Sequence, residues 1–298
     1  MVGEPLTYPI ESEAAPRVSE FKRFRRVFLG RGVVIFGLVI LIIFIILAIF
    51  APLVAPYNPN RQDLNNTLLT PNQTHLLGTD IFGRDTLSRI IFGARTSLLI
   101  GLSVVFISSA TGMALGLIAG YFGGWTFTII MRLIDALMTF PMIILALVIA
   151  SLLGNGMKNV IVALTVSIIP VYTRLMCAQV LSVKQNDYIT ACRSTGCGYS
   201  RLLIIHILPN CLQPFIILIT MMLGSVILAE AGLSFLGIGI EPPTAAWGSM
   251  INEARPYLFT NPILSLIPGV AIMLVAFSFN MVGDGLRDAL DPRLRGTL

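Results

Sequence analysis

Few residues in this sequence have the type and spacing that catalysis or metal binding requires. The two histidines, His75 and His206, are predicted on opposite sides of a membrane and cannot share a metal. The sequence contains no G-x-x-x-x-G-K-[ST] phosphate loop, no H-E-x-x-H and no G-x-S-x-G. Cys192 and Cys197 have C-x4-C spacing, but no second pair lies nearby to complete a zinc site. We therefore expect no active site, metal or cofactor in this chain.

The polar segment 184–205 is more informative, because its residues are suited to contact with another protein. Asn186 or Asp187 can cap a short helix, and Gly196 and Gly198 can end it. The residues between them are mostly small. The alternative is an amphipathic loop that lies on the lipid surface. Such a loop needs bulky apolar residues opposite clustered Lys and Arg. Small side chains instead permit close approach, so we expect a docking helix.

The elements that position this segment follow from the composition. The chain of 298 residues is 55% hydrophobic and 12% charged, whereas a soluble domain carries roughly 25% charged residues. A soluble fold of this size cannot bury so many apolar side chains, and disorder requires the opposite composition. The sequence therefore predicts an all-α membrane protein with several spans.

Runs without charged residues predict six transmembrane helices, because a span needs about 20 apolar residues. The run between Arg95 and Arg132 is long enough for two helices and is divided at Tyr121–Trp125, where two glycines favour a turn. The expected spans are 33–52, the run ending near 120, and about 126–153, 158–182, 206–232 and 262–283.

The distribution of Lys and Arg predicts the orientation. With the N-terminus inside, 14 of these residues fall on the cytoplasmic side and 6 outside, which favours cytoplasmic termini. The basic surplus then orients the chain in a lipid bilayer and does not indicate nucleic-acid binding. The expected segments are the tails 1–32 and 291–298, the first span 33–52, the external loop 53–94, and a core 95–290 with a cytoplasmic loop 184–205 and an external loop 234–261.

The cytoplasmic segment resembles the EAA loop of bacterial ABC-transporter permease subunits. Ala191 and Cys192 occupy the two Ala positions, Gly196 the Gly position, and Ile207-Leu208-Pro209 the closing element, while Thr190 replaces Glu. The resemblance implies that this segment binds the ATPase subunits. The residues it assigns to coupling are Asp187, Tyr188, Thr190, Ala191, Cys192, Gly196, Arg201 and Pro209.

Further motifs are similar to the dipeptide/oligopeptide and nickel branch of this family. They are HLLGTDIFGRD at 75–85, GARTSL at 93–98, AGYFGG at 119–124, LSFLG at 233–237, GDGLRD at 283–288 and DPR at 291–293. The long first external loop resembles that of the C-type subunit. The resemblance implies a type I importer permease fold, a second permease subunit, two ATPase subunits that bind ATP and Mg, and an external substrate-binding protein.

A few polar residues within the spans are candidate gate or pathway residues. Arg132 and Asp135, at i,i+3, could form a structural ion pair or part of a gate. Arg174 is expected to reach the cytoplasmic surface, and Glu230 to line a cavity or lie at the interface. A doubled G-x-x-x-G at 112, 116 and 120 permits close helix packing, within the subunit or at the dimer seam.

The two external loops are expected to receive the binding protein. Arg84, Asp85 and Arg89 could follow a turn at Gly83 into a short helix along the membrane. In the second loop, Glu241 precedes two prolines that stiffen the chain toward Trp247. Arg84, Asp85, Glu241 and Trp247 are therefore the predicted docking residues.

The sequence predicts a non-enzymatic permease subunit of an ATP-driven, binding-protein-dependent importer in the inner membrane. Peptides are the expected cargo, and nickel or metal chelates and glutathione remain alternatives within the same family. A secondary transporter is the more distant alternative, disfavoured because acidic residues deep in the spans are scarce.

Overall fold

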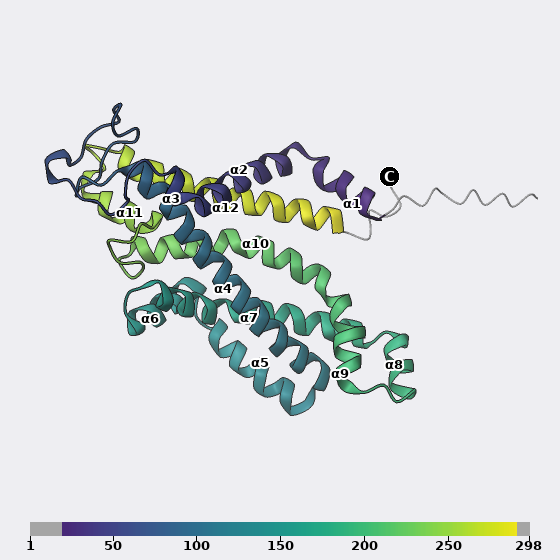
Figure 1. The fold of residues 1–298 in the computed structure, drawn as a ribbon. Coiled ribbons are helices and arrows are strands. Elements are labelled where there is room, and N and C mark those ends of the chain that lie inside the picture. Colours follow the sequence, from purple (N-terminus) through teal and green to yellow (C-terminus); the bar gives the residue numbers. More distant parts are fainter. Residues whose placement is uncertain (1–19, 291–298) are drawn as a thin grey trace, which may run out of the picture.

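The structure, a computed structural model, describes residues 20–290, and within that range the chain is helical without a β-strand (Figure 1). The expected tail 291–298 and residues 1–19 of the expected N-terminal tail lie outside the described residues. The elements in chain order are α1 Glu20–Leu29, α2 Gly32–Ile49, α3 Ala51–Val54, η1 Leu64–Asn66, α4 Thr86–Phe122, α5 Gly124–Met138, α6 Met142–Leu153, α7 Met157–Lys184, α8 Asp187–Ser194, α9 Tyr199–Arg201, η2 Leu202–Ile207, α10 Leu208–Phe235, α11 Trp247–Ala254, η3 Arg255–Tyr257 and α12 Ile263–Leu290.

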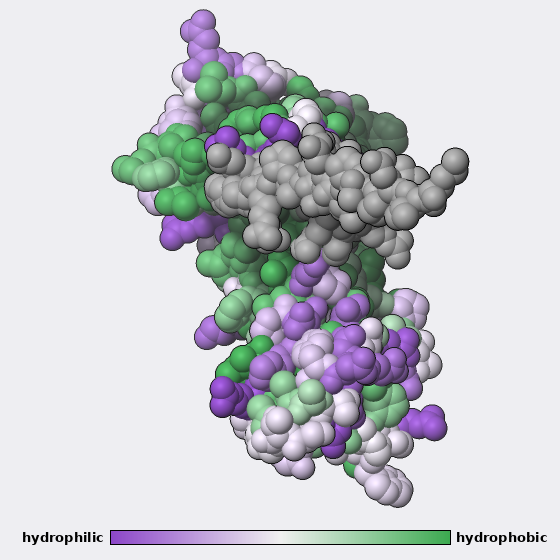
Figure 2. Space-filling model, turned by 90° about the vertical axis from the view of Figure 1, so that its right-hand side faces the viewer, coloured by the Kyte–Doolittle hydropathy of each residue, from purple (hydrophilic) through white to green (hydrophobic). Residues whose placement is uncertain are grey.

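The long helices run between two ends of the molecule (Figure 1). One end, which we call the α8 end, holds α1, α8, α9 and the C-terminal end of α12. The other, the α11 end, holds α11 and the loop between α3 and α4. Figure 2 looks onto the α8 end, where polar residues gather over the part that Figure 1 assigns to α8 and α9.

Five helices of the described chain are long and apolar enough to cross a membrane, and there is a sixth crossing if the bent pair α5–α6 counts as one span. Their positions agree with the charge-free runs of the sequence. The first of them, α2, has no polar side chain, and Ile42, Ile43 and Ile46 on its surface are each about half exposed. An exposed helix face that carries only apolar side chains is suited to contact with the lipid chains of a bilayer.

The three glycines of α4 form a close seam with α7. A Cβ atom at Gly112 would lie 2.5 Å from the Cβ of Tyr172, and one at Gly116 would lie 2.6 Å from the carbonyl oxygen of Thr173. At Gly120 the Cβ would lie 2.8 Å from that of Val180. Only residues without a side chain allow this approach. The doubled G-x-x-x-G therefore packs within the subunit, which was one of its two predicted roles.

The predicted third span is broken. The sequence predicts one helix over 126–153, but α5 and α6 meet at an angle of 88° between Met138 and Met142. Pro141 lacks an N–H group and disfavours a helical conformation at Phe140, so the helix ends there. The continuous helix was a wrong prediction because the nine apolar residues after Pro141 extend the apolar run and conceal the break.

A second difference lies at the start of the predicted fifth span. The sequence predicts a span that begins at about residue 206, but α9, η2 and α10 form one helix of 37 residues over Tyr199–Phe235. Pro209 cannot donate to the preceding turn, and the helix passes it through the π-helical turns of η2. The helix that contains α10 therefore begins at Tyr199, directly after the turn that follows α8.

Candidate functional sites

The predicted coupling segment is a helix and turn projecting from the α8 end (Figure 1). Ile189 alone in α8 is fully buried, whereas Tyr188, Thr190 and Ala191 are exposed and Cys192 is half-buried against the core. The small residues therefore lie on the accessible side. Asn186 is the N-cap, although its side chain makes no capping hydrogen bond.

Two glycines near the end of α8 differ in backbone conformation. Gly196 has a φ of 79°, which L-amino acids rarely adopt, and its N–H donates to the carbonyl of Arg193. Gly198 has an ordinary φ of −65°. The turn at Gly196 therefore requires glycine for its conformation, in agreement with the family motif. The remaining predicted coupling residues are also exposed: Asp187 at the start of α8, and Arg201 and Pro209 on the helix that follows.

An aromatic and cationic contact fixes this segment to the ends of α4 and α7. Tyr199 meets Tyr121 edge-on with ring centroids 6.1 Å apart, and it also contacts Phe122. Lys184 donates from Nζ to the carbonyl of Tyr121 at 2.7 Å. Sequence reasoning missed these residues because the contacts join positions far apart in the chain.

At the α11 end, four charged side chains form a buried cluster, which we call the four-charge cluster: Asp80, Arg84, Arg89 and Glu253. Arg84 donates from Nε to Asp80 Oδ2 at 2.6 Å and from Nη2 to Glu253 Oε2 at 2.5 Å. Arg89 lies 3.4 Å and 3.7 Å from the same two carboxylate oxygens. Both arginines are at most 1% exposed. The cluster connects the first loop to α11.

The charges in this cluster depend on one another. Burial raises the pKa of Glu253, and the positive charges of Arg89 and Arg84 oppose that rise. Asp80 also shapes the turn before α4, since its Oδ1 accepts from the N–H groups of Phe82 and Arg84. Neither Asp80 nor Glu253 stood out in the sequence as a partner of Arg84.

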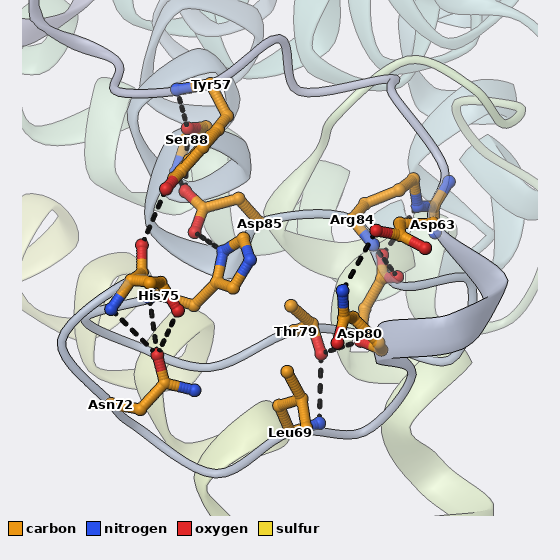
Figure 3. A network of polar contacts seen from close by, with 12 residues as sticks. Tyr57, Asp63, Leu69, Asn72, His75, Thr79, Asp80, Arg84, Asp85 and Ser88 are labelled. Atoms are coloured by element: carbon orange, nitrogen blue, oxygen red, sulfur yellow. Dashed lines mark hydrogen bonds and ion pairs between the residues drawn. The ribbon is translucent and has the colours of Figure 1, made fainter.

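A second group of polar residues lies beside the four-charge cluster (Figure 3). Asp85 caps α4 by accepting from the N–H and hydroxyl of Ser88 at 2.8 and 2.7 Å. Its other oxygen lies 2.8 Å from Nδ1 of His75. Tyr57 donates its N–H to the Ser88 hydroxyl, and its ring lies 4.9 Å from that of His75. This network holds the first loop against the start of α4.

The four predicted docking residues therefore differ in their exposure to solvent. Arg84, Asp85 and Trp247 are buried, and the indole N–H of Trp247 donates to the carbonyl of Ile90 at 3.0 Å. Glu241 is exposed. The predicted short helix after Gly83 does not exist as a separate element, because Arg89 belongs to the 37-residue helix α4. The three buried side chains cannot touch a partner directly and instead support the surface.

Glu230 is fully buried between α4 and α10. Its two carboxylate oxygens accept from the hydroxyls of Ser97 at 3.1 Å and Ser234 at 2.9 Å. The carboxyl group is therefore enclosed between two helices in the single chain.

The expected pair of Arg132 with Asp135 is not formed. Asp135 instead accepts from Nη2 of Arg174 on α7 at 2.5 Å, and the two side chains are 47% and 48% exposed. Arg174, which the sequence predicts to reach the cytoplasmic surface, has Asp135 as its ion-pair partner in the described chain. The way α5 packs against α7 brings the carboxylate of Asp135 to Arg174 and not to Arg132.

Comparison with known proteins identifies the family of this chain. Residues 112–296 match the family described as binding-protein-dependent transport system inner membrane components. Residues 19–71 match the N-terminal transmembrane domain of oligopeptide transport permease C.

Individual relatives are similar along nearly the whole chain. The dipeptide transport system permease protein DppC of Haemophilus influenzae is 45% identical over 99% of this chain and all of its own. The di/tripeptide transport system permease protein DppC of Pseudomonas aeruginosa is 43% identical over 93% of each chain. The glutathione transport system permease protein GsiD of Escherichia coli is 41% identical over 98% of this chain and 95% of its own. From the all-helical fold, the apolar spans and these matches, the chain belongs to the family of binding-protein-dependent transport system inner membrane components.

Proposed function

We propose that this chain is one of two homologous permease subunits of an ATP-driven importer for di- and oligopeptides. Its family makes it a multi-pass inner-membrane transport component. The observation that carries the peptide assignment is the 45% identity to a dipeptide permease over 99% of the chain. The chain itself is proposed to be non-catalytic, with ATP and Mg bound by two partner ATPase subunits.

Glutathione is the second candidate substrate. A glutathione permease is 41% identical over nearly the same length, close to the identity of the dipeptide permeases. Both substrates carry free amino and carboxylate groups, so the same permease design can accommodate either.

The proposed topology has six crossings and both termini in the cytoplasm, in a type I importer arrangement. In this proposal α5 and α6 together form one broken crossing. Support comes from basic residues of the described chain at the α8 end, where Arg25 and Arg26 belong to α1, Arg193 to α8, Arg201 to α9 and Arg287 to the end of α12.

In this arrangement, α8 and the turn at Gly196 bind the ATPase subunits. Support comes from the exposed small residues of α8 and from the left-handed conformation of Gly196. Movement of the segment would pass to α10 along the continuous helix and to α4 and α7 through Tyr199 and Lys184. The resulting movement of α4, α7 and α10 would then open the translocation pathway.

The α11 end is the proposed surface for the binding protein. Glu241 supplies an exposed charge there, whereas Arg84, Asp85 and Trp247 hold the two loops in place. A substitution of Glu241 should therefore weaken stimulation of ATP hydrolysis by the binding protein, and substitutions of the buried three should reduce stability.

Transport by the reconstituted complex tests the proposed function. Proteoliposomes that contain both permease subunits and the ATPases, together with the loaded binding protein, should accumulate a labelled dipeptide only with ATP. Parallel assays with labelled glutathione separate the two substrates. Accumulation without ATP, driven by an ion gradient, would instead establish a secondary transporter.

The two glycines near α8 provide a matched test of coupling. Gly196→Leu should release the ATPase subunits from the purified complex, because its φ of 79° is strained for leucine. Gly198→Ala should retain them, since its φ of −65° suits alanine and no atom lies within 4 Å of the added Cβ. Equal retention by both variants would contradict the proposed site.

A further inference from the structure

The Asp135–Arg174 pair lies near the middle of the proposed bilayer, deeper than the cytoplasmic surface that the sequence predicts for Arg174. Asp135 is about 16 Å along α5 from Gly124, and Arg174 is about 15 Å along α7 from Lys184, at a rise of 1.5 Å per residue. Trp125, at the start of α5, is exposed and has the side chain typical of a membrane interface. The hydrocarbon core is about 30 Å thick, so both helices place the pair at similar depth.

At that depth the exposure of the pair excludes lipid as its neighbour. About half of each side chain is accessible in the single chain. Charged groups inside membrane spans face a protein interior or a water-filled cavity, because hydrocarbon offers no hydrogen bonds. Something polar must therefore lie against this face in the assembled complex.

Polar and small residues continue along the same faces of both helices. On α5, Thr128, Arg132, Asp135 and Thr139 recur at helical spacing and are all exposed. On α7, Arg174 is followed one and two turns later by Ala178 and Ser182, also exposed. The exposed face of α2, in contrast, carries only apolar side chains.

The opposite face of α7 is already occupied. Tyr172, Thr173 and Val180 meet the glycines of α4, and Tyr172 and Thr173 are fully buried. Arg174 therefore points away from the close seam. Helix α5 ends at Met138, about one turn beyond Asp135, and the chain bends there by 88° into α6.

We propose that the exposed faces of α5 and α7 line a water-filled translocation pathway, in which Asp135 and Arg174 contact the charged ends of a passing zwitterionic peptide. This inference rests on the proposed function and specifies its pathway. The carboxylate of Asp135 matches a substrate ammonium group, and the guanidinium of Arg174 matches a substrate carboxylate. Because the two residues neutralise each other, a zwitterion can replace both partners without leaving an isolated charge.

Cysteine labelling in the reconstituted complex tests whether water reaches this face. Thr139→Cys lies one turn from Asp135, and Ala178→Cys lies one turn from Arg174. Ile43→Cys and Ile46→Cys on α2 are matched controls, exposed in the single chain but apolar in surroundings. A charged, membrane-impermeant thiosulfonate reagent is applied, and modification at each site is quantified by mass spectrometry, so the native cysteines can stay in place.

We expect the Thr139→Cys and Ala178→Cys sites to react at least tenfold faster than the two α2 sites. Addition of loaded binding protein and ATP should change their rates, because substrate then enters the pathway. Rates as slow as those of α2 would overturn the pathway assignment and would indicate that the second subunit covers this face. ATP-driven transport by the unmodified complex would still establish the proposed function.

Substitutions of the pair test the contact with substrate. Asp135→Asn and Arg174→Gln should each lower dipeptide transport about tenfold, while both permease subunits and the ATPases still co-purify as an assembled complex. If Asp135→Arg combined with Arg174→Asp restored full transport, the pair would be structural and the substrate contact would be wrong. Continued loss in that double variant supports the contact, because the charges then face the wrong ends of an oriented substrate.

Discussion

Two groups of charged residues in this chain differ in their surroundings. The four-charge cluster at the α11 end is almost sealed, with Arg84 and Arg89 at most 1% exposed and two carboxylates between them. The Asp135–Arg174 pair has a single mutual contact and is about half exposed. The first group encloses its charges, whereas the second leaves one side of each charge accessible.

The difference separates a structural role of the cluster from the role in transport that we propose for the pair. A buried charge needs several partners, and removing one of them leaves the others without compensation. The cluster therefore fixes the first loop to α11, across 169 positions of sequence. A half-exposed pair contributes little to stability and can exchange partners. The following experiments test this contrast, from the largest expected effect to the smallest.

Arg84→Met should lower the free energy of unfolding by about 3–5 kcal/mol, because Asp80 and Glu253 would stay buried without their main cation. Thermal unfolding of the purified complex in detergent measures the effect. Arg61→Met, at an exposed arginine of the same loop, should change stability much less. Equal losses in the two variants would show that burial in the cluster does not matter.

Gly116→Leu tests the seam that supports the face opposite Arg174. Its Cβ would lie 2.6 Å from the carbonyl of Thr173, so α4 and α7 must separate. We expect a loss of about 1–3 kcal/mol or failure to assemble, as for overpacked cores. Gly269→Leu is the control because no atom lies within 4 Å of its Cβ. Assembly and thermal unfolding are measured for both, and a stable Gly116→Leu complex would contradict the seam.

Asp85→Ala should cost about 0.5–2 kcal/mol through loss of the cap on α4. The contact with His75 is lost in the same variant. Asp85→Asn keeps an oxygen that can cap the helix and should lose less. Unfolding midpoints of the two variants give the comparison, and the capping explanation fails if asparagine is as damaging as alanine.

Asp135→Asn and Arg174→Gln should each change stability by about 0–1 kcal/mol, because the pair is half exposed. The same unfolding assay measures them beside Arg84→Met. A loss of stability as large as that of Arg84→Met would remove the contrast between the two groups of charged residues. It would indicate that the Asp135–Arg174 pair stabilises the fold.

Much of the fold follows from local features of the sequence. A span requires about 20 apolar residues, so the gaps between charged residues located the long helices. The glycines at 112, 116 and 120 predicted close packing because their spacing places them on one helix face. The turn at Gly196 was also predictable, since glycine readily adopts the left-handed conformation found there.

The partners of charged side chains were not predictable from such features. Asp135 has Arg132 three residues away, yet it pairs with Arg174, 39 positions distant. Arg84 and Trp247 have the residue types of an exposed docking surface, but contacts between the two loops bury them.

The sequence by itself determined which segments are apolar enough to cross a membrane, where glycine permits close approach and which family the chain resembles. These properties depend on residues within a few turns of one another. Only the tertiary structure decided which charges are enclosed and which remain accessible, because that depends on how α5 is rotated against α7 and how the first loop lies on α11.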